Sequence, residues 1–215
     1  QCGFTQPTGT FGDSDQAVKG ITPAVRDLIA DLQIRMATEA LKCGIVTTAT
    51  IVVGSKGAKS KLDLRNYQGP NGNVTQAWHQ ASHHATKGGA AAKNSHIGYN
   101  HWHANNVANI ISRMKALNIF NNSVVVWGNE YGDSNRNHTH DNMSMVVAGS
   151  LGGYFRVGQY LKLPGTDAGT NGNSYNQFNQ TCILTAVGRG MGVLTANEKW
   201  GSAQYAQNPP PGLIR

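Results

Sequence analysis

The chain has few charged residues and no long hydrophobic run. Charged residues make up 13% of its 215 residues, which is about half the share found in average soluble proteins. No apolar run approaches the ~18 residues that a membrane-spanning helix needs, so we expect no membrane span. Amides, hydroxyls and glycine carry the polarity instead of charge. This composition favours a periplasmic, extracellular or cell-surface protein over a cytosolic one.

Acidic residues are scarcer than basic ones, which gives a formal net charge of +7. The one dense basic stretch is 56–65, and it has no interleaved aromatic residues. It therefore reads as a solvated loop, and we do not expect a nucleic-acid partner. Binding of an acidic polymer through this loop remains an alternative, and strong salt dependence would be its mark.

Cysteine is also rare. Cys2, Cys43 and Cys182 allow one disulfide and one free thiol. Cys182 lies within an apolar helical pattern that is typical of a core position, so we favour a Cys2–Cys43 bridge.

The spacing of apolar residues predicts alternating helices and strands. Proline at position 23 and glycine at position 44 bound the first helix. The expected helices are 23–44, 97–118 and 177–190; the expected strands are 45–53, 123–127 and 143–148, with a further extended segment at 154–163. Buried strands alternating with amphipathic helices predict an α/β fold with a mostly parallel sheet flanked by helices. We expect residues 1–215 to form a single domain, with irregular arms at 1–20 and 203–215.

All eight histidines lie between His79 and His140, so we expect the chemistry in this window. His79 and His83 are four residues apart and share one face if 76–85 is helical, as in two-histidine zinc sites. Gln80 stands where a metallopeptidase helix carries its glutamate base, so that mechanism is not expected. Ser82 is either a nucleophile with a neighbouring imidazole as its base, or a local hydrogen-bonding residue. We expect metal or substrate contact from at least one of His79, His83 and His84.

A second group opens the long helix. His96, Tyr99 and His103 share a face if that helix starts early. His101 lies among them. The alternative interpretation is a polar helix terminus lying over the sheet.

A third group follows the predicted strand 123–127, where functional loops of α/β sheets gather. It combines oxygen and nitrogen ligands with a cation, as metal-assisted hydrolysis of an anionic substrate requires. Its members are Glu130, Asp133, Arg136, His138, His140 and Asp141.

Residues 79–84 read His-x-x-Ser-His-His, the signature of a family of uncharacterised exported bacterial proteins named after this motif. The segments 124–133, 138–142 and 146–153 also resemble that family, as do 191–193 and 200–202. The resemblance covers the chain from Cys2 to its end.

This resemblance implies a distant similarity to the alkaline phosphatase and sulfatase superfamily, an α/β sandwich with a metal site at the strand ends. It nominates Glu130, Asp133, His138 and His140 as ligands. The chain resembles only the C-terminal half of the family's usual length, whereas the superfamily takes its nucleophile and first metal carboxylates from the N-terminal half. We therefore expect a second polypeptide that supplies that half, or a homo-oligomer.

The leading hypothesis is an exported metal-binding hydrolase-like protein acting on phosphate or sulfate esters. Zinc is the expected ion, with ligands or near-ligands from His79, His83, Glu130, Asp133, His138, His140 and Asp141. Ser82, His83 and His84 would assist catalysis, and Arg136 would hold the anion. The alternative is a non-catalytic secreted structural, adhesive or self-assembling protein that retains the fold.

Overall fold

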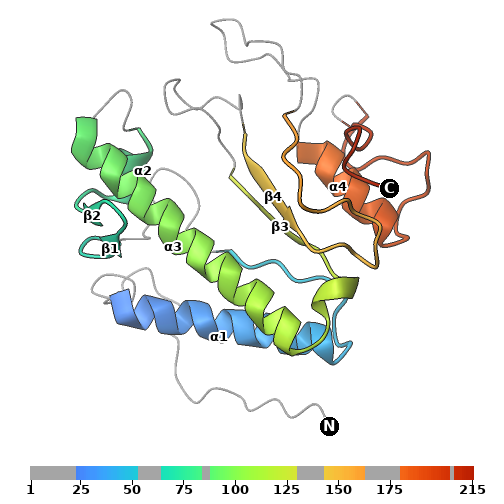
Figure 1. Cartoon of the computed structure of the whole chain (residues 1–215), viewed down its shortest axis with the longest axis horizontal. Coiled ribbons are helices and arrows are strands. Elements are labelled where there is room, and N and C mark those ends of the chain that lie inside the picture. The colour runs from blue at the N-terminus through green and yellow to red at the C-terminus, as the bar shows by residue number, and fades with distance from the viewer. Residues whose placement is uncertain (1–22, 53–63, 84–87, 130–142, 163–179, 204–205) are drawn as a thin grey trace, which may run out of the picture. The chain divides into compact units, whose positions relative to one another are not determined.

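A computed structural model describes the chain in two separate units (Figure 1). The first runs from Gln1 to Ala116 and the second from Leu117 to Arg215. Within them the structure describes residues 23–52, 64–83, 88–129, 143–162, 180–203 and 206–215.

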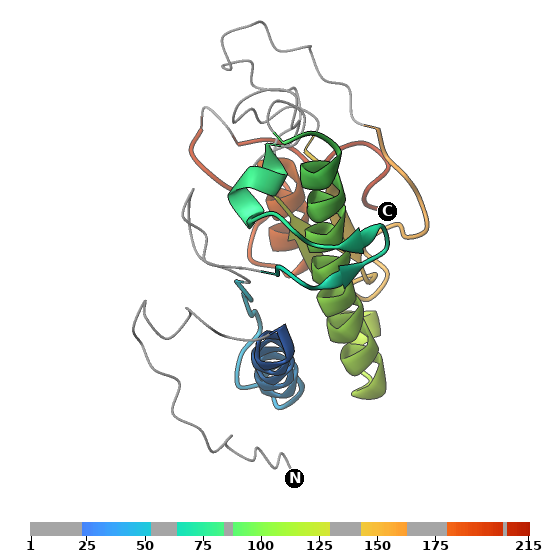
Figure 2. The ribbon, with the colours of Figure 1, turned by 90° about the vertical axis from the view of Figure 1, so that its left-hand side faces the viewer.

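The long helix α3 organises the first unit. α1, α2 and both strands of a small hairpin contact it, and Figure 2 shows the hairpin and α2 lying along it. The elements are α1 (Pro23–Lys42), β1 (Gln68–Gly69), β2 (Gly72–Asn73), α2 (Trp78–Ser82) and α3 (Gly89–Ala116). The strands pair antiparallel, with Gly69 opposite Gly72.

The core of the first unit gathers around Tyr99 and Trp102 of α3. Its buried members are Ala30, Leu64, Val74, Ala81, Tyr99 and Trp102. The Tyr99 hydroxyl accepts a hydrogen bond from the Leu64 amide at 3.2 Å and donates one to the Gln76 carbonyl at 3.3 Å. The buried Tyr99 side chain thereby pairs one backbone group before the hairpin and one after it. A buried backbone amide or carbonyl without a hydrogen bond would destabilise the fold.

Helix α1 buries one of its faces. Ala30, Ile34 and Thr38 are buried, at the four-residue spacing of one helix face. Several large apolar residues on other faces remain exposed, at 43% for Val25, 57% for Leu28 and 46% for Met36. On the buried face, Ala30 packs in the cluster that contains Tyr99 and Trp102 of α3. The contact is fixed by polar bonds as well, since the Trp102 indole donates to Asp27 Oδ1 at 2.6 Å.

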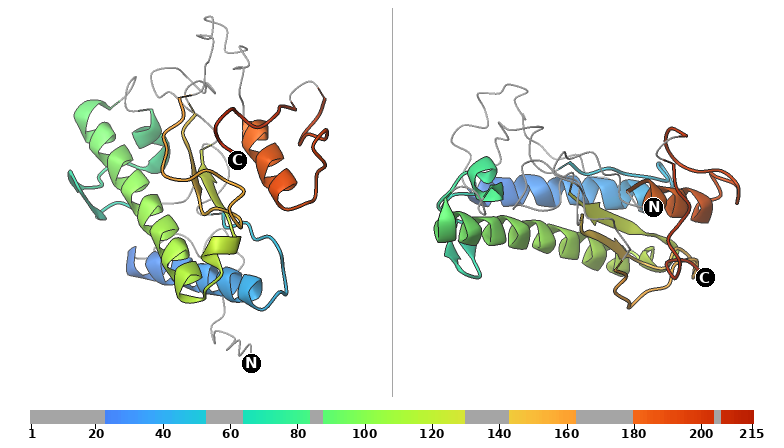
Figure 3. Two further views of the ribbon diagram at one scale, coloured as in Figure 1. Left: turned by 45° about the vertical axis from the view of Figure 1, so that its right-hand side comes forward. Right: turned by 90° about the horizontal axis from the view of Figure 1, so that it is seen from above.

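The second unit packs one helix against a strand pair (Figure 3). Its elements are the 3-10 turn η1 (Phe120–Asn122), β3 (Val125–Gly128), β4 (Met145–Ala148) and α4 (Gln180–Gly190). β3 and β4 pair antiparallel, from Val125 opposite Ala148 to Gly128 opposite Met145. Their apolar side chains cover a buried cluster of Phe155, Cys182, Ile183, Ala186 and Leu213.

The C-terminal residues 206–215 are irregular, as expected, but they belong to this core. Leu213 is buried, its carbonyl accepts the Arg156 amide, and the Arg215 amide donates to the Tyr154 carbonyl. Residues 1–20 lie outside the described part of the chain. The single-domain expectation stays a prediction.

The predicted fold class is wrong. The strands in the described residues form two separate two-stranded antiparallel sheets, not a mostly parallel sheet flanked by helices. A run of apolar residues reports that a strand is buried, but it does not report the direction of its partner. Residues 129–144 between β3 and β4 are enough for a parallel crossover, so neither composition nor connection length reveals that the two strands pair antiparallel.

The positions of the helices were predicted better than those of the strands. Helices were expected near α1, α3 and α4 and are found there, although α3 begins eight residues earlier than position 97. The strands 123–127 and 143–148 correspond to β3 and β4 within two residues. The strand at 45–53 is wrong, because residues 45–52 are irregular and Val53 lies outside the described residues. The described part of 154–163 holds only an isolated bridge, from Phe155 to Ile214.

The cysteines behave differently from one another. Cys182 is buried and carries a free thiol, as expected for a core position. Burial raises the pKa of that thiol to about 11, so it is protonated and unreactive at neutral pH. Cys43 is disulfide-bonded. Its expected partner Cys2 lies outside the described residues.

No helix in the described segments combines the length and apolarity needed to cross a bilayer. The absence of a span that the sequence predicted is thus confirmed for those segments.

Substituting Gly98 tests the close approach between the hairpin and α3. A Cβ at Gly98 would overlap Val74 Cγ2, and a Cβ at Gly69 would lie 2.9 Å from the Gly98 Cα. Alanine normally stabilises a helix interior relative to glycine. Here we expect Gly98→Ala to lower the free energy of unfolding by about 1–3 kcal/mol through overpacking. Urea unfolding measures the change, and the loss should shrink in the Val74→Ala background. Equal losses in both backgrounds would contradict the proposed contact.

Candidate functional site

Helix α2 carries the first histidine group and is held to the core at its entrance and along one face. The amides of Thr75 and Gln76, just before the helix, donate to the hydroxyl of Ser95 on α3, both at 3.1 Å. Ser95 and Ala81 are fully buried. Since Ala81 faces the core, the residues two positions away on either side are directed away from it. The helix thus presents His79 and His83 on its outer side.

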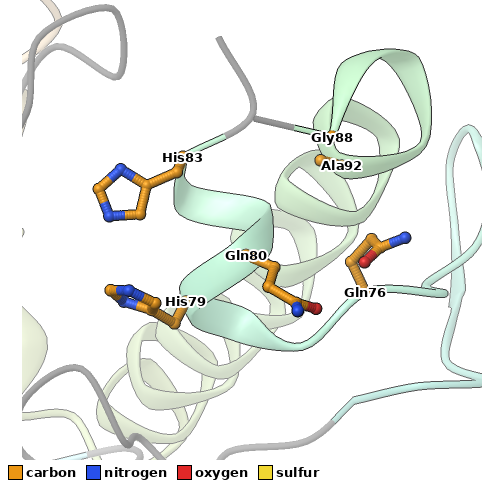
Figure 4. A pocket seen from close by; sticks show the side chains of 6 residues that line it. All are labelled: Gln76, His79, Gln80, His83, Gly88 and Ala92. Atoms are coloured by element: carbon orange, nitrogen blue, oxygen red, sulfur yellow. The ribbon is translucent and has the colours of Figure 1, made fainter. Parts of the chain in front are cut away.

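His79 and His83 form the pair that the spacing predicted. Their ring centroids are 4.8 Å apart and the ring planes are nearly perpendicular, at 81°. Figure 4 shows both rings projecting side by side from α2. They line an open cavity of about 360 Å³, together with Gln76, Gln80, Gly88 and Ala92. The described residues of the lining therefore offer two imidazoles and two amides.

Ser82 lies between these histidines in the sequence, but its hydroxyl is used locally. Its Oγ donates to the His79 carbonyl at 2.8 Å. This geometry matches the interpretation of Ser82 as a local hydrogen-bonding residue. A nucleophilic role would require the hydroxyl to turn toward an imidazole, and it stays a prediction.

The second histidine group surrounds Trp78, the first residue of α2. His96 stacks on the indole with a centroid distance of 5.9 Å, while Tyr99 and His103 meet its edge or face at 4.9 and 5.7 Å. Because α3 begins at Gly89, these three residues share one face of the helix, as predicted for an early start. The aromatic contacts fix α2 against α3. Trp78, their centre, was not predicted from the sequence, although its place beside His79 was a usable signal.

Burial sets the protonation of His103. Desolvation lowers its pKa from 6.5 to about 4, so the ring is neutral at physiological pH. Its ring also contacts Trp102 at 5.3 Å. A neutral imidazole packed between two indoles serves the core and cannot carry protons near pH 7.

His101 lies on another side of α3. Its Nδ1 forms a 2.9 Å hydrogen bond with the Tyr67 hydroxyl, which also accepts the Asn105 amide at 3.3 Å. This bond ties the segment before β1 to α3. Tyr67 was not among the residues that the sequence singled out.

The four carboxylates in the described residues have structural partners. Asp27 accepts the Trp102 indole, and Asp31 pairs with Arg35 at 2.7 Å. Glu39 lies 3.9 Å from Arg113, and Glu198 accepts the Thr195 amide at 2.7 Å. Within the described segments no three histidine, cysteine or acidic residues gather as a metal site would require.

Most of the remaining candidates cannot be placed. These residues lie outside the described part of the chain: His84, Glu130, Asp133, Arg136, His138, His140 and Asp141. Their roles as ligands, catalytic residues or anion-binding residues therefore stay predictions.

Comparisons with protein-family models, curated proteins and solved structures gave no match to this chain. The resemblance to the His-x-x-Ser-His-His family stays a prediction carried by residues 79–84 and the downstream segments.

The lowered pKa of His103 predicts a specific loss of stability in acid. The folded state holds the ring neutral down to about pH 4, whereas the unfolded chain protonates it below pH 6.5. Protonation therefore favours unfolding, and stability is lost as the pH falls from 6.5 toward 4. We expect this one group to lower the free energy of unfolding by about 2–3 kcal/mol across that window.

Urea unfolding of the protein and of His103→Gln, followed by circular dichroism at several pH values, measures this contribution. The variant should show a weaker pH dependence, while His101→Gln serves as the control that keeps His103. Parallel pH profiles for the protein and His103→Gln would contradict this assignment.

Proposed function

We propose that the chain is an exported metal-binding hydrolase-like protein that acts on phosphate or sulfate esters. The observation that carries the proposal is the His79–His83 pair, two imidazoles one helical turn apart at the mouth of an open cavity. Histidine pairs with this spacing bind transition metals in proteins. Zinc is the proposed ion, because imidazole nitrogen is among its preferred ligands.

The donor set around α2 fits part of a zinc coordination sphere. The two rings would supply two ligands, and the predicted ligands in 130–141, together with water or an ester oxygen, would complete the sphere. Gln80 and Gln76 add neutral amides to the same cavity. These amides can donate to the oxygens of an anionic ester, and the net charge of +7 attracts anions to the protein.

The proposed chemistry divides roles among these residues. A bound zinc ion would polarise an ester oxygen and make a coordinated water more acidic. His79 and His83 would hold the ion, with Glu130, Asp133, His138, His140 and Asp141 as the predicted further ligands. Arg136 would hold the phosphate or sulfate group, and His84 would assist proton transfer. Ser82 would become a nucleophile only after giving up its bond to the His79 carbonyl.

Export is supported by the disulfide at Cys43. Structural disulfides persist in oxidising compartments such as the periplasm or the cell exterior, and they are rare in the cytosol. We propose a periplasmic, extracellular or cell-surface location on this basis.

A partner is proposed as well, either a second polypeptide that completes the fold or another copy of this chain. Large apolar side chains on the outer faces of α1, at Val25, Leu28 and Met36, support this proposal. Contiguous apolar surface on a soluble protein commonly marks an interaction site.

Zinc binding tests the proposed function directly. Isothermal titration of the metal-free protein with Zn²⁺ should show binding. His79→Ala and His83→Ala should each lower the zinc affinity by at least about tenfold, because the loss of a residue that merely orients a metal ligand already lowers metal affinity by about that factor. His101→Ala is the matched control, because it also removes an imidazole, but one that is hydrogen-bonded to the Tyr67 hydroxyl and is not among the residues that line the cavity. Zinc-dependent hydrolysis of an aryl phosphate or sulfate should likewise fall in the His79→Ala and His83→Ala variants and persist in His101→Ala.

Absence of zinc binding, or equal losses in the His79, His83 and His101 variants, would reject this site. Zinc binding without ester hydrolysis would reject the hydrolase and retain the metal site.

A further inference from the structure

Residues 45–52 have the composition of a strand but no strand partner among the described residues. Seven of the eight are isoleucine, valine or threonine, and none is charged. β-branched residues favour strands because their side chains pack well on a pleated surface. Yet this segment, which follows α1, is irregular in the structure (Figure 1).

The segment is exposed along nearly its whole length. Ile45 is 72% exposed, Val52 66% and Val46 37%. Within the described residues, no backbone hydrogen bond joins 47–52 to another segment. An uncharged, exposed, β-branched run without proline is a surface that pairs readily with another strand. The Ile45 and Val46 amides donate to the Ala40 carbonyl, while the backbone groups of 47–52 have no such bond among the described residues.

The order of the side chains identifies the strand that fits best. In an extended chain, Val46, Thr48, Thr50 and Val52 lie on one face. This face reads the same in both directions about Ala49. Two antiparallel copies related by a two-fold axis must place each residue opposite one of the same parity. With Ala49 on that axis, valine meets valine and threonine meets threonine.

We propose that residues 45–52 pair antiparallel with the same segment of a second copy of this chain, with Ala49 at the two-fold axis. Cross-strand pairs of β-branched residues and of threonines stabilise antiparallel strands. Because the segment is uncharged, the pairing brings no like charges together at the junction of two chains that each carry +7. The contact is isologous and closes as a dimer.

The pairing gives Val46 and Val52 a direct cross-strand contact that they lack in one chain. A two-stranded ribbon of this length is marginal by itself, so the dimer should form in a concentration-dependent manner. This inference deepens the proposed homo-oligomer and is independent of the metal site. A monomer that binds zinc would overturn the pairing alone, and a dimer without zinc would overturn the metal site alone.

Charge substitutions at the paired valines test both the dimer and its register. Sedimentation of the full chain over a range of concentrations should show a monomer–dimer equilibrium. Val46→Lys/Val52→Lys places lysine opposite lysine twice and should weaken dimerisation at least about tenfold. Val46→Lys/Val52→Glu places lysine opposite glutamate twice and should restore it. A monomer at every concentration, or equal effects of the two double variants, would overturn the proposal.

Crosslinking provides a second measurement of the register. Ala49→Cys places two thiols directly opposite each other, so mild oxidation should give a covalent dimer on a non-reducing gel. Thr48→Cys is the control, because its two thiols lie diagonally, near or beyond the limit for a disulfide. Preferential crosslinking through position 48, or none at either position, would overturn the proposed register.

Discussion

The close approach of the hairpin to α3 at Gly69 and Gly98 is the constraint on which the rest of the first unit depends. Only at this separation does the Tyr99 hydroxyl reach both the Leu64 amide and the Gln76 carbonyl. The chain leaving β2 then runs beside Ser95, whose hydroxyl accepts two successive amides at the entrance to α2. The orientation of α2 is thus set by backbone groups bonded to α3 before any histidine is involved.

Helices could be predicted from this sequence because their signals are local. The proline at position 23, the glycine at position 44 and the apolar spacing act within a few turns, and α1 follows them. The inward face of α1 could not be read from hydrophobicity alone, because Ala30 and Thr38 are buried on it while the larger Leu28 stays exposed. The strand at 45–53 failed for a related reason: its composition was right, but a strand exists only where another backbone pairs with it.

In the candidate site, too, only the features that depend on neighbouring residues in the sequence could be predicted. The four-residue spacing of His79 and His83 sufficed to place both rings on one side of α2. Two facts lay beyond sequence reasoning, because each depends on residues distant along the chain. Trp78 became an aromatic centre only when α3 brought His96 and His103 to it, and Asp27 proved to serve the Trp102 indole. A polar residue type shows what chemistry is available, whereas its partners decide whether that chemistry is used.

The described histidines divide into two classes through these partners. His96 and His103 pack on Trp78 and His101 bonds to Tyr67, so the fold uses their rings as packing and bridging groups. The rings at the cavity belong to α2, which begins at Trp78. Whatever loosens the Trp78 contacts must therefore also loosen the helix that orients those two rings. Since protonation of His103 is unfavourable in the packed state, acid should disturb the arrangement of the His79–His83 pair from within the core.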